Sequence, residues 1–233
     1  MIYEQLKPLY IFGAGGFGRE VEWLVERINR ISPTWDVRGY IDDDRELWET
    51  KNGKSKVCGG REYLESQKND IWLVVAIGNT KVRRKIVDGL CSFQHIHFAT
   101  LIDPGVTASD SVEIGEGSII CAGTIVTVDV SIGRHNIINL DCTVGHDAVL
   151  EDFVTLYPSV NISGAVCIGD TSEIGTGVQV IQGTMIGKGS VVGAGSVVIK
   201  SLEPDVTAVG IPAKVVKCHN HERFGGGYFS SRT

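Results

Sequence analysis

The sequence predicts two joined folds, a small parallel α/β domain followed by a parallel β-helix. The first sign is a change of composition near residue 100, because all four tryptophans precede it and residues 102–197 hold only two aromatics, Phe153 and Tyr157. The second is a run of sixteen consecutive six-residue repeats that starts at Ile102 and has no insertion. We therefore expect an α/β domain over residues 1–100, a β-helix over 101–217 and a C-terminal tail over 218–233.

The repeats have two apolar or small positions in every six. The first is Ile, Val or Leu in fifteen of sixteen repeats, and the fifth is Val, Ser, Thr, Ala or Cys in all but one; the exceptions are Ala108 and Asn136. This spacing describes a short strand followed by a corner, and neither a helical period nor a simple alternation produces it. It predicts a solenoid whose repeats bury their apolar edges by stacking on their neighbours.

Glycine supports the same interpretation, at 29 of 233 residues. Fourteen of the fifteen glycines between 102 and 197 occupy the second or fourth position of a repeat. Tight corners need the backbone freedom that glycine has. Gly164, at a third position, is the exception.

The first hundred residues alternate strand-like and helix-like patterns, which predicts a small doubly wound parallel sheet. The expected strands are 8–12, 37–41 and 71–77, and the expected helices are 19–31 and a second one containing Val82, Ile86 and Val87.

A glycine-rich turn follows the first predicted strand. Gly13, Gly15 and Gly18 fit the pattern G-x-G-x-x-G before a helix, where the backbone can approach a phosphate. Asp42, about 24 positions after Gly18, suits a ribose hydroxyl. A domain of about 100 residues holds little more than half of a dinucleotide site, so a mononucleotide or nucleotide sugar is favoured over NAD. A purely structural glycine turn is the alternative.

Composition excludes several classes of protein. The net charge of −6 without a block of like charges makes nucleic acid an unexpected partner, and no apolar run approaches a membrane span. The six cysteines form no Cys-x-x-Cys pair, which suits reduced thiols that pack rather than bind metal. No secretory signal is visible at the N-terminus, so a cytoplasmic location is expected.

The chain resembles bacterial sugar O- and N-acyltransferases that join a nucleotide-binding domain to a left-handed β-helix. This family includes the sialic acid O-acetyltransferase type and the acetyltransferases of UDP- or GDP-linked 4-amino-4-deoxy sugars. The matching segments are residues 11–16, 40–43, 76–79, 100–104, 138–147 and 209–214.

The resemblance implies a triangular prism with three repeats per coil, a homotrimer, and acetyl-CoA as cosubstrate in a groove between neighbouring prisms, with no metal. It implies N-acetylation of a nucleotide-linked 4-amino sugar in surface glycan biosynthesis, by direct attack on the thioester. O-acetylation of sialic acid or another sugar hydroxyl is one alternative. A non-catalytic β-helical binding or scaffold protein is another, and an NAD oxidoreductase is the weakest.

His146 matches the family's general base, a role that suits an imidazole that is neutral near pH 7. Asp147 matches the acidic residue that orients the base; Asp129, one coil earlier, is the other candidate for that role. Asn139 is expected to contact the substrate, although a purely structural ladder role is nearly as plausible.

Gly164 follows His146 by three repeats, which is one coil, and is therefore expected directly above it. We hypothesise that its missing side chain leaves room for the acyl group and that its N–H stabilises the developing oxyanion. With Gly164, Thr176 and Ala194 are expected to bind acetyl-CoA. The residues expected to bind the nucleotide sugar are Gly13, Gly15, Gly16, Asp42, Asp43, Gly78 and Asn79.

Two positions depart from the family pattern. Several relatives have a histidine nine positions after the base, where this chain has Thr155, and another after the glycine pair, where it has Phe17. The acyl and nucleotide contacts are therefore expected to differ. His135 and His146 are separated by fewer than two repeats rather than by the three of a full coil, so they do not stack and no zinc site is expected.

Overall fold

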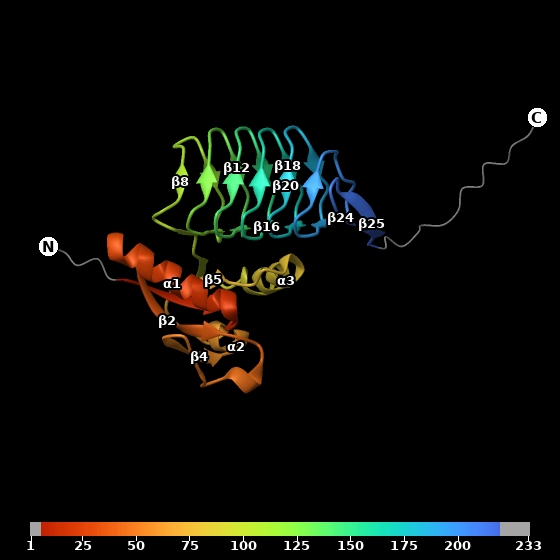
Figure 1. Ribbon diagram of the computed structural model, residues 1–233. Coiled ribbons are helices and arrows are strands. Elements are labelled where there is room, and N and C mark those ends of the chain that lie inside the picture. Colours follow the sequence, from red (N-terminus) through yellow and green to blue (C-terminus); the bar gives the residue numbers. More distant parts are fainter. Residues whose placement is uncertain (1–5, 220–233) are drawn as a thin grey trace, which may run out of the picture.

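The computed structural model describes residues 6–219 and has two parts, an α/β domain and a prism that lies against it (Figure 1). The α/β sheet has the order β3-β4-β2-β1-β5-β6 and is parallel except for the β3–β4 hairpin. Because β2 and β5 flank β1, the chain switches direction at β1, as in a doubly wound sheet. The strands are β1 (Lys7–Phe12), β2 (Trp35–Ile41), β3 (Lys51–Asn52), β4 (Ser55–Gly59), β5 (Ile71–Val75) and β6 (Ile96–Phe98).

Three α-helices and one 3-10 helix complete this domain: α1 (Gly16–Ile31), η1 (Arg45–Leu47), α2 (Arg61–Glu65) and α3 (Thr80–Leu90). Helix α1 begins three residues before its predicted start, because the glycines of the turn form its first turn. In α3 the predicted apolar face is partly wrong, since Val82 is 47 % exposed whereas Arg83 is buried at 1 %. The buried side of α3 faces the prism as well as the sheet. Arg83 makes the contact with the prism, where it donates to backbone carbonyls.

The prism is a parallel β-helix with three faces of stacked two-residue strands. Each strand pairs with the strand three repeats further on, as Ile119 pairs with Ile137. The first face contains β7 (Leu101–Ile102), β10 (Ile119–Ile120), β13 (Ile137–Ile138), β16 (Thr155–Leu156), β19 (Glu173–Ile174), β22 (Val191–Val192), β24 (Val206–Val209) and the antiparallel β25 (Lys214–Cys218).

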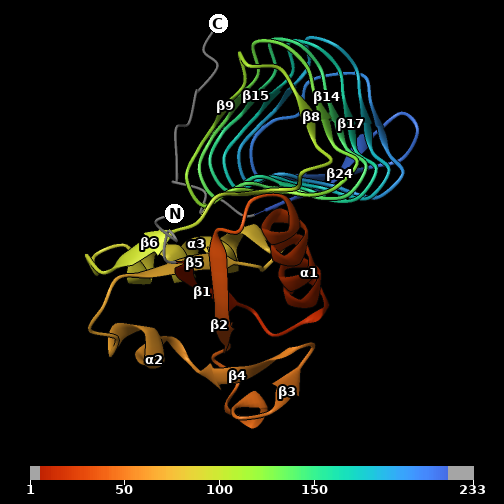
Figure 2. The same cartoon turned by 90° about the vertical axis from the view of Figure 1, so that its left-hand side faces the viewer.

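The second and third faces follow the first at each turn of the chain. The second contains β8 (Thr107–Ala108), β11 (Ile125–Val126), β14 (Thr143–Val144), β17 (Asn161–Ile162), β20 (Gln179–Val180) and β23 (Val197–Val198). The third contains β9 (Glu113–Ile114), β12 (Ser131–Ile132), β15 (Val149–Leu150), β18 (Cys167–Ile168) and β21 (Met185–Ile186). In Figure 2 the chain runs counter-clockwise through the three faces as it recedes from the viewer, which is a left-handed coil.

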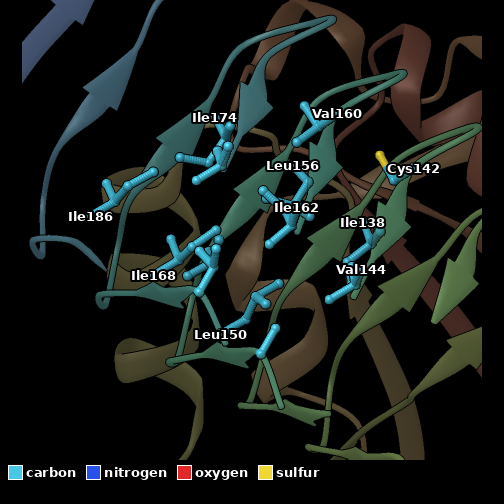
Figure 3. Packing of buried hydrophobic residues seen from close by; sticks show 14 of the residues in the cluster. Ile138, Cys142, Val144, Leu150, Leu156, Val160, Ile162, Ile168, Ile174 and Ile186 are labelled. Carbon is cyan, nitrogen blue, oxygen red and sulfur yellow. The ribbon is translucent and has the colours of Figure 1, made fainter. Parts of the chain in front are cut away.

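The first and fifth repeat positions point inward and form the core of the prism, as the repeat pattern predicts (Figure 3). Ile102 and Ala108 are exposed because no coil lies beneath the first one. Asn136 is buried at a fifth position with its amide fully hydrogen-bonded. Nδ2 donates to the carbonyls of Gly133 and Glu151, and Oδ1 accepts from the N–H of Val154. At the corners, every fourth-position residue from 117 to 195 has a positive φ, glycine or not.

The α/β domain covers the first face, which we call the docked face (Figure 2). Its outward residues Leu101, Ile119 and Ile137 are buried in one cluster with residues of β1 and α1. An ion pair between Arg27 and Asp103 closes one end of this contact, at 2.6 Å. The prism therefore has two corners beside the α/β domain and one opposite it.

We name these corners by their place. The outer corner, opposite the docked face, contains residues 145–148; the front corner joins the docked and second faces and contains 139–142; the inner corner joins the third and docked faces and contains 133–136. No helix of residues 6–219 is long and apolar enough to cross a membrane. Of the predicted tail, residues 220–233 lie outside the described residues.

Candidate active site

His146 and Asp147 form a pair at the outer corner. Nδ1 of His146 lies 2.7 Å from Oδ2 of Asp147, and the two side chains are 51 % and 62 % exposed. Side chains of neighbouring residues usually diverge, but Asp147 has φ +59°, which turns its carboxylate back toward the ring. With Nδ1 bonded to the carboxylate, Nε2 is the nitrogen that remains to accept a proton.

Gly164 lies directly over the ring of His146, as the three-repeat coil predicts. A Cβ at Gly164 would lie 2.5 Å from Cε1 of His146 and still closer to Nε2. The expectation that the missing side chain leaves room for an acyl group is therefore wrong in one respect: the imidazole itself fills that space. The N–H of Gly164 donates to no other described residue, so a ligand at this corner can accept from it.

Asp129 and Asn139 do not join this pair. The N–H of Asp129 is bonded to Ser111, and no contact joins its carboxylate to His146, which leaves Asp147 as the residue that orients the ring. Asn139 lies at the front corner, where its Oδ1 accepts from the N–H of Leu140 at 2.7 Å. Within one chain the structure does not bring Asn139 to His146.

The glycine turn sits between the carboxyl ends of β1 and β5. Gly13 has φ +109°, and a Cβ there would lie 2.9 Å from the carbonyl oxygen of Ala76, so only glycine fits. Gly15 and Gly16 face open space instead: a Cβ at Gly15 meets nothing within 4 Å, and one at Gly16 meets only the guanidinium of Arg19, at 3.9 Å. The turn is therefore accessible to a phosphate at the N-terminus of α1.

Asp42 and Asp43 both have structural partners within the α/β domain. Both oxygens of Asp42 accept backbone N–H groups, from Ala14 at 2.9 Å and Asp44 at 3.0 Å, so this carboxylate fixes the glycine turn to the end of β2. Asp43 is paired with Arg61. Burial alone would raise the pKa of Asp43, but the hydrogen bonds from Arg61 outweigh it and hold that pKa below its usual value.

Gly78 and Asn79 are in the loop after β5, and both have structural partners. Oδ1 of Asn79 caps α3 by accepting from the N–H of Val82 at 3.0 Å. Gly78 lies against the prism, since a Cβ there would be 3.3 Å from the hydroxyl of Tyr157. The loop thus borders both the glycine turn and the front corner.

The predicted site residues therefore fall into two groups, at two corners of one prism. His146, Asp147 and Gly164 share the outer corner. Thr176 and Ala194 stack one coil apart at the front corner, with Asn139 and beside the loop of Gly78. The second face of the prism separates the two groups.

Two hollows on the described surface lie away from both groups. One of about 710 Å³ is at the amino ends of the strands, beside Lys7 and Trp72, and one of about 250 Å³ is at the inner corner beside His135. His135 is 5 % exposed and lies between Phe98 and Phe153, with ring centroids 4.8 and 5.0 Å away. No cluster of three or more metal-binding side chains occurs within residues 6–219.

Comparison with known proteins agrees with this architecture. Residues 8–90 match the family described as the PglD N-terminal domain. GDP-perosamine N-acetyltransferase of Escherichia coli O157:H7 is 30 % identical over 168 residues, which cover 72 % of this chain and 75 % of that protein. The chain belongs to the hexapeptide-repeat sugar N-acetyltransferases.

Two solved structures of this family superpose on nearly the whole chain. The acetyltransferase domain of PglB from Neisseria gonorrhoeae FA1090, in complex with acetyl coenzyme A, has a TM-score of 0.81 and 32 % identity over 91 % of this chain and all of that one. PerB from Caulobacter crescentus, in complex with CoA and GDP-perosamine, has a TM-score of 0.79 and 30 % identity over 91 % of this chain and 99 % of that one. The protein is accordingly an acetyltransferase.

This member of the sugar N-acetyltransferases uses Thr155 for packing rather than for ligand contact. Thr155 is 1 % exposed, donates to the carbonyl of Gly78 at 2.8 Å and accepts from Arg83 at 3.0 Å. Phe17 is partly buried in the cluster that contains Ala14 and Cys121. Both departures thus lie where the α/β domain meets the prism.

Two residues near the site escape sequence analysis. Asn52 donates to the carbonyl of Ala14 at 2.8 Å and accepts from Arg19 at 3.1 Å, which closes the β3–β4 hairpin over the glycine turn. Arg83 is part of a basic stretch, residues 81–85, which is typical of a solvent-exposed helix face. Its position three residues before Ile86 and four before Val87, which places it on their side of the helix, is the sequence signal for its burial.

Proposed function

We propose that the protein transfers the acetyl group of acetyl-CoA to the amine of a nucleoside diphosphate-linked 4-amino-4-deoxy sugar. The observation that carries the proposal is the exposed His146–Asp147 pair beside the free N–H of Gly164. The named relative and PerB support the substrate class. Residues 1–100 would hold the nucleotide and residues 101–217 the acyl donor.

The chemistry follows from the outer corner. Nε2 of His146 takes the proton from the sugar amine as its nitrogen bonds to the thioester carbonyl carbon and the C–S bond breaks. The imidazolium so formed returns that proton to the departing thiolate. Asp147 stabilises the imidazolium, and the N–H of Gly164 donates to the negative charge on the carbonyl oxygen.

The prism has room for an extended cosubstrate along both corners. A Cβ added at Gly177, Gly183 or Gly195 would meet nothing within 4 Å. Gly183 follows Gly164 along the outer corner, whereas Gly177 and Gly195 follow Thr176 and Ala194 at the front corner. Acetyl-CoA held between an outer corner and a front corner would contact all three predicted binding residues.

This geometry favours a homotrimer. His146 lies at the corner opposite the face that the α/β domain covers, so a sugar bound at the glycine turn of one chain needs the base of another (Figure 2). Joining the outer corner of each chain to the front corner of the next is a head-to-tail contact, and a three-fold ring closes it. A cytoplasmic location suits the substrates and the six free cysteines.

The shared site can be tested by mixing two inactive variants. His146→Ala removes the base, and Gly15→Glu places a carboxylate at the phosphate site without a clash, since Gly15 faces open space. In randomly mixed trimers about one quarter of the sites combine an intact turn with an intact base, and activity returns to about that fraction of wild type. Mixed trimers without activity would show that each site lies within one chain.

The substrate is tested by thiol release from acetyl-CoA with UDP-, GDP- and dTDP-linked amino sugars, CMP-sialic acid and free sialic acid. We expect turnover with a nucleotide-linked amino sugar and loss of it in His146→Ala. Turnover with only the sialic acids would establish O-acetylation instead. A silent panel would show that the acceptor belongs to neither of these two classes of sugar.

A further inference from the structure

Arg83 of α3 is a buried cation that joins the nucleotide side of the protein to the prism. We propose that Arg83 is a positioning residue of the transferase: it fixes the loop of residues 76–79 on the prism and so sets where the bound sugar stands relative to the base of the neighbouring chain. The proposal rests on the proposed function.

Six hydrogen bonds hold the guanidinium, and they divide between the two parts. Toward the loop, Nη1 donates to the carbonyls of Ile77 at 2.6 Å and Gly78 at 3.0 Å. Toward the prism, Nε donates to the carbonyl of His135 at 2.9 Å, and Nη2 donates to residues 153–155. A single planar group therefore connects the loop to two successive coils.

The charge of Arg83 is not explained by an ion pair. No carboxylate of residues 6–219 lies within ion-pairing distance of it, and Glu173 acts on it only at longer range. Burial lowers its pKa to about 10, which means that the protein interior disfavours the charged form. A buried cation without a carboxylate partner is a poor way to gain stability, so the geometry of its hydrogen bonds is the better explanation for its presence.

The loop that Arg83 holds is in contact with the nucleotide site. A Cβ at Gly13 would lie 2.9 Å from the carbonyl of Ala76 and 3.1 Å from the side chain of Ile77, so the glycine turn packs directly on this loop. Because Arg83 donates to the carbonyls of Ile77 and Gly78, the backbone of the loop is held in one position beside the front corner. A shift of the loop would move the turn and any phosphate on it.

Two further contacts make the loop rigid against the prism. Thr155 donates to the carbonyl of Gly78, and Thr80 donates its hydroxyl to the carbonyl of Thr171 at 2.9 Å. Neither replaces Arg83, since each bonds the loop or α3 to a single coil. Lysine at position 83 would keep the charge but not the planar fork that reaches both sides.

Arg84 provides a matched control. It is the next residue of α3 and also crosses to the prism, where it pairs with Asp170 and lies over the ring of Phe153. Its side chain is 37 % exposed, and its ion pair and ring contact are with the prism rather than with the loop. Arg84→Lys therefore changes the same interface by the same substitution without altering the loop.

The test compares Arg83→Lys with Arg84→Lys on two acceptors, a nucleotide-linked amino sugar and hydroxylamine. Hydroxylamine needs the base and acetyl-CoA but not the nucleotide site. For Arg83→Lys we expect kcat with the nucleotide sugar to fall about 30- to 100-fold, as for a misplacement of about 1 Å, with KM for acetyl-CoA and the hydroxylamine rate within about twofold of wild type. Arg84→Lys should keep both rates.

Hydrogen–deuterium exchange gives a readout that does not depend on activity. In Arg83→Lys the amides of Thr80 and Val82, which donate to Glu173 on the prism and to Asn79 of the loop, should exchange at least about tenfold faster, while those of residues 161–168 are unchanged. Equal losses on both acceptors, or unaltered exchange at Thr80 and Val82, would overturn the proposal. If wild type acetylates no nucleotide sugar, the proposed function fails, and the exchange data alone then decide whether Arg83 holds the loop.

Discussion

Two histidines of the same prism, His146 and His135, have opposite surroundings. His146 is half-exposed at the outer corner, lies under Gly164 and has a carboxylate on Nδ1. His135 is buried at the inner corner between two phenylalanines and lies over Gly117. Both rings depend on a glycine for their space, so the glycine alone does not identify a catalytic histidine.

What differs is whether the α/β domain covers the corner. At the inner corner, burial together with the charges of Arg83 and Arg134 lowers the pKa of His135 to about 4, which keeps it neutral. Its backbone carbonyl, not its ring, takes part in the contact with Arg83. We therefore expect the chemistry at the uncovered corner, whereas the covered one supports the contact between the α/β domain and the prism.

The largest expected effect comes from removing one ring or the other. His146→Ala should lower kcat for acetyl transfer about 10²- to 10⁴-fold, because a general base contributes that much. His135→Phe should keep activity within about threefold, since Phe153 shows that phenylalanine fits a corner of positive φ. Steady-state thiol release measures both. A large loss of activity in His135→Phe with an unchanged melting temperature would show that His135 also contributes to the reaction.

The second prediction concerns the glycine over the base. Gly164→Ala should lower kcat about 100-fold, because the added Cβ displaces the imidazole by about 1 Å or more. Its φ is not positive, so alanine causes no backbone strain and the melting temperature should change little. In a His146→Ala background the same substitution should add almost nothing, and an additive loss would mean that Gly164 acts apart from the ring.

The third prediction is a pH effect on stability at the inner corner. Between about pH 6.5 and pH 4 the unfolded chain protonates His135 whereas the folded chain does not, so stability falls as the pH is lowered through this window. In His135→Phe we expect the free energy of unfolding to fall by about 2 kcal/mol less than in wild type when the pH is lowered through this window. Urea unfolding at pH 7 and pH 4.5 measures it; identical pH dependence in both proteins would show that His135 titrates normally.

The repeat makes most of the prism predictable. A six-residue period determines which side chains point inward, and a coil of three repeats places Gly164 over His146 without any knowledge of the α/β domain. The same period cannot show which face is covered. Consequently the repeat predicts only the positions of Thr155 and His135, and their burial is visible in the structure alone.

The nucleotide side is less predictable because its contacts come from distant segments. The glycine pattern locates the turn correctly, but the partners of Asp42 are backbone groups that no spacing rule specifies. Arg83 is the clearest case, since it bonds residues 52 to 72 positions away along the chain. The local pattern in α3 predicts that Val82 is buried, but the contact with the prism buries Arg83 and leaves Val82 exposed.

The smallest expected effect is that of removing the charge of Asp147, which measures the contribution of this carboxylate to kcat. Asp147→Asn keeps the size of the side chain and tolerates positive φ, so the fold should be unaffected. Without the negative charge the imidazolium formed during transfer is less stabilised, and kcat should fall about tenfold, about 1.4 kcal/mol. If Asp147→Asn retains full activity, the exposure of His146 rather than its partner would distinguish it from His135.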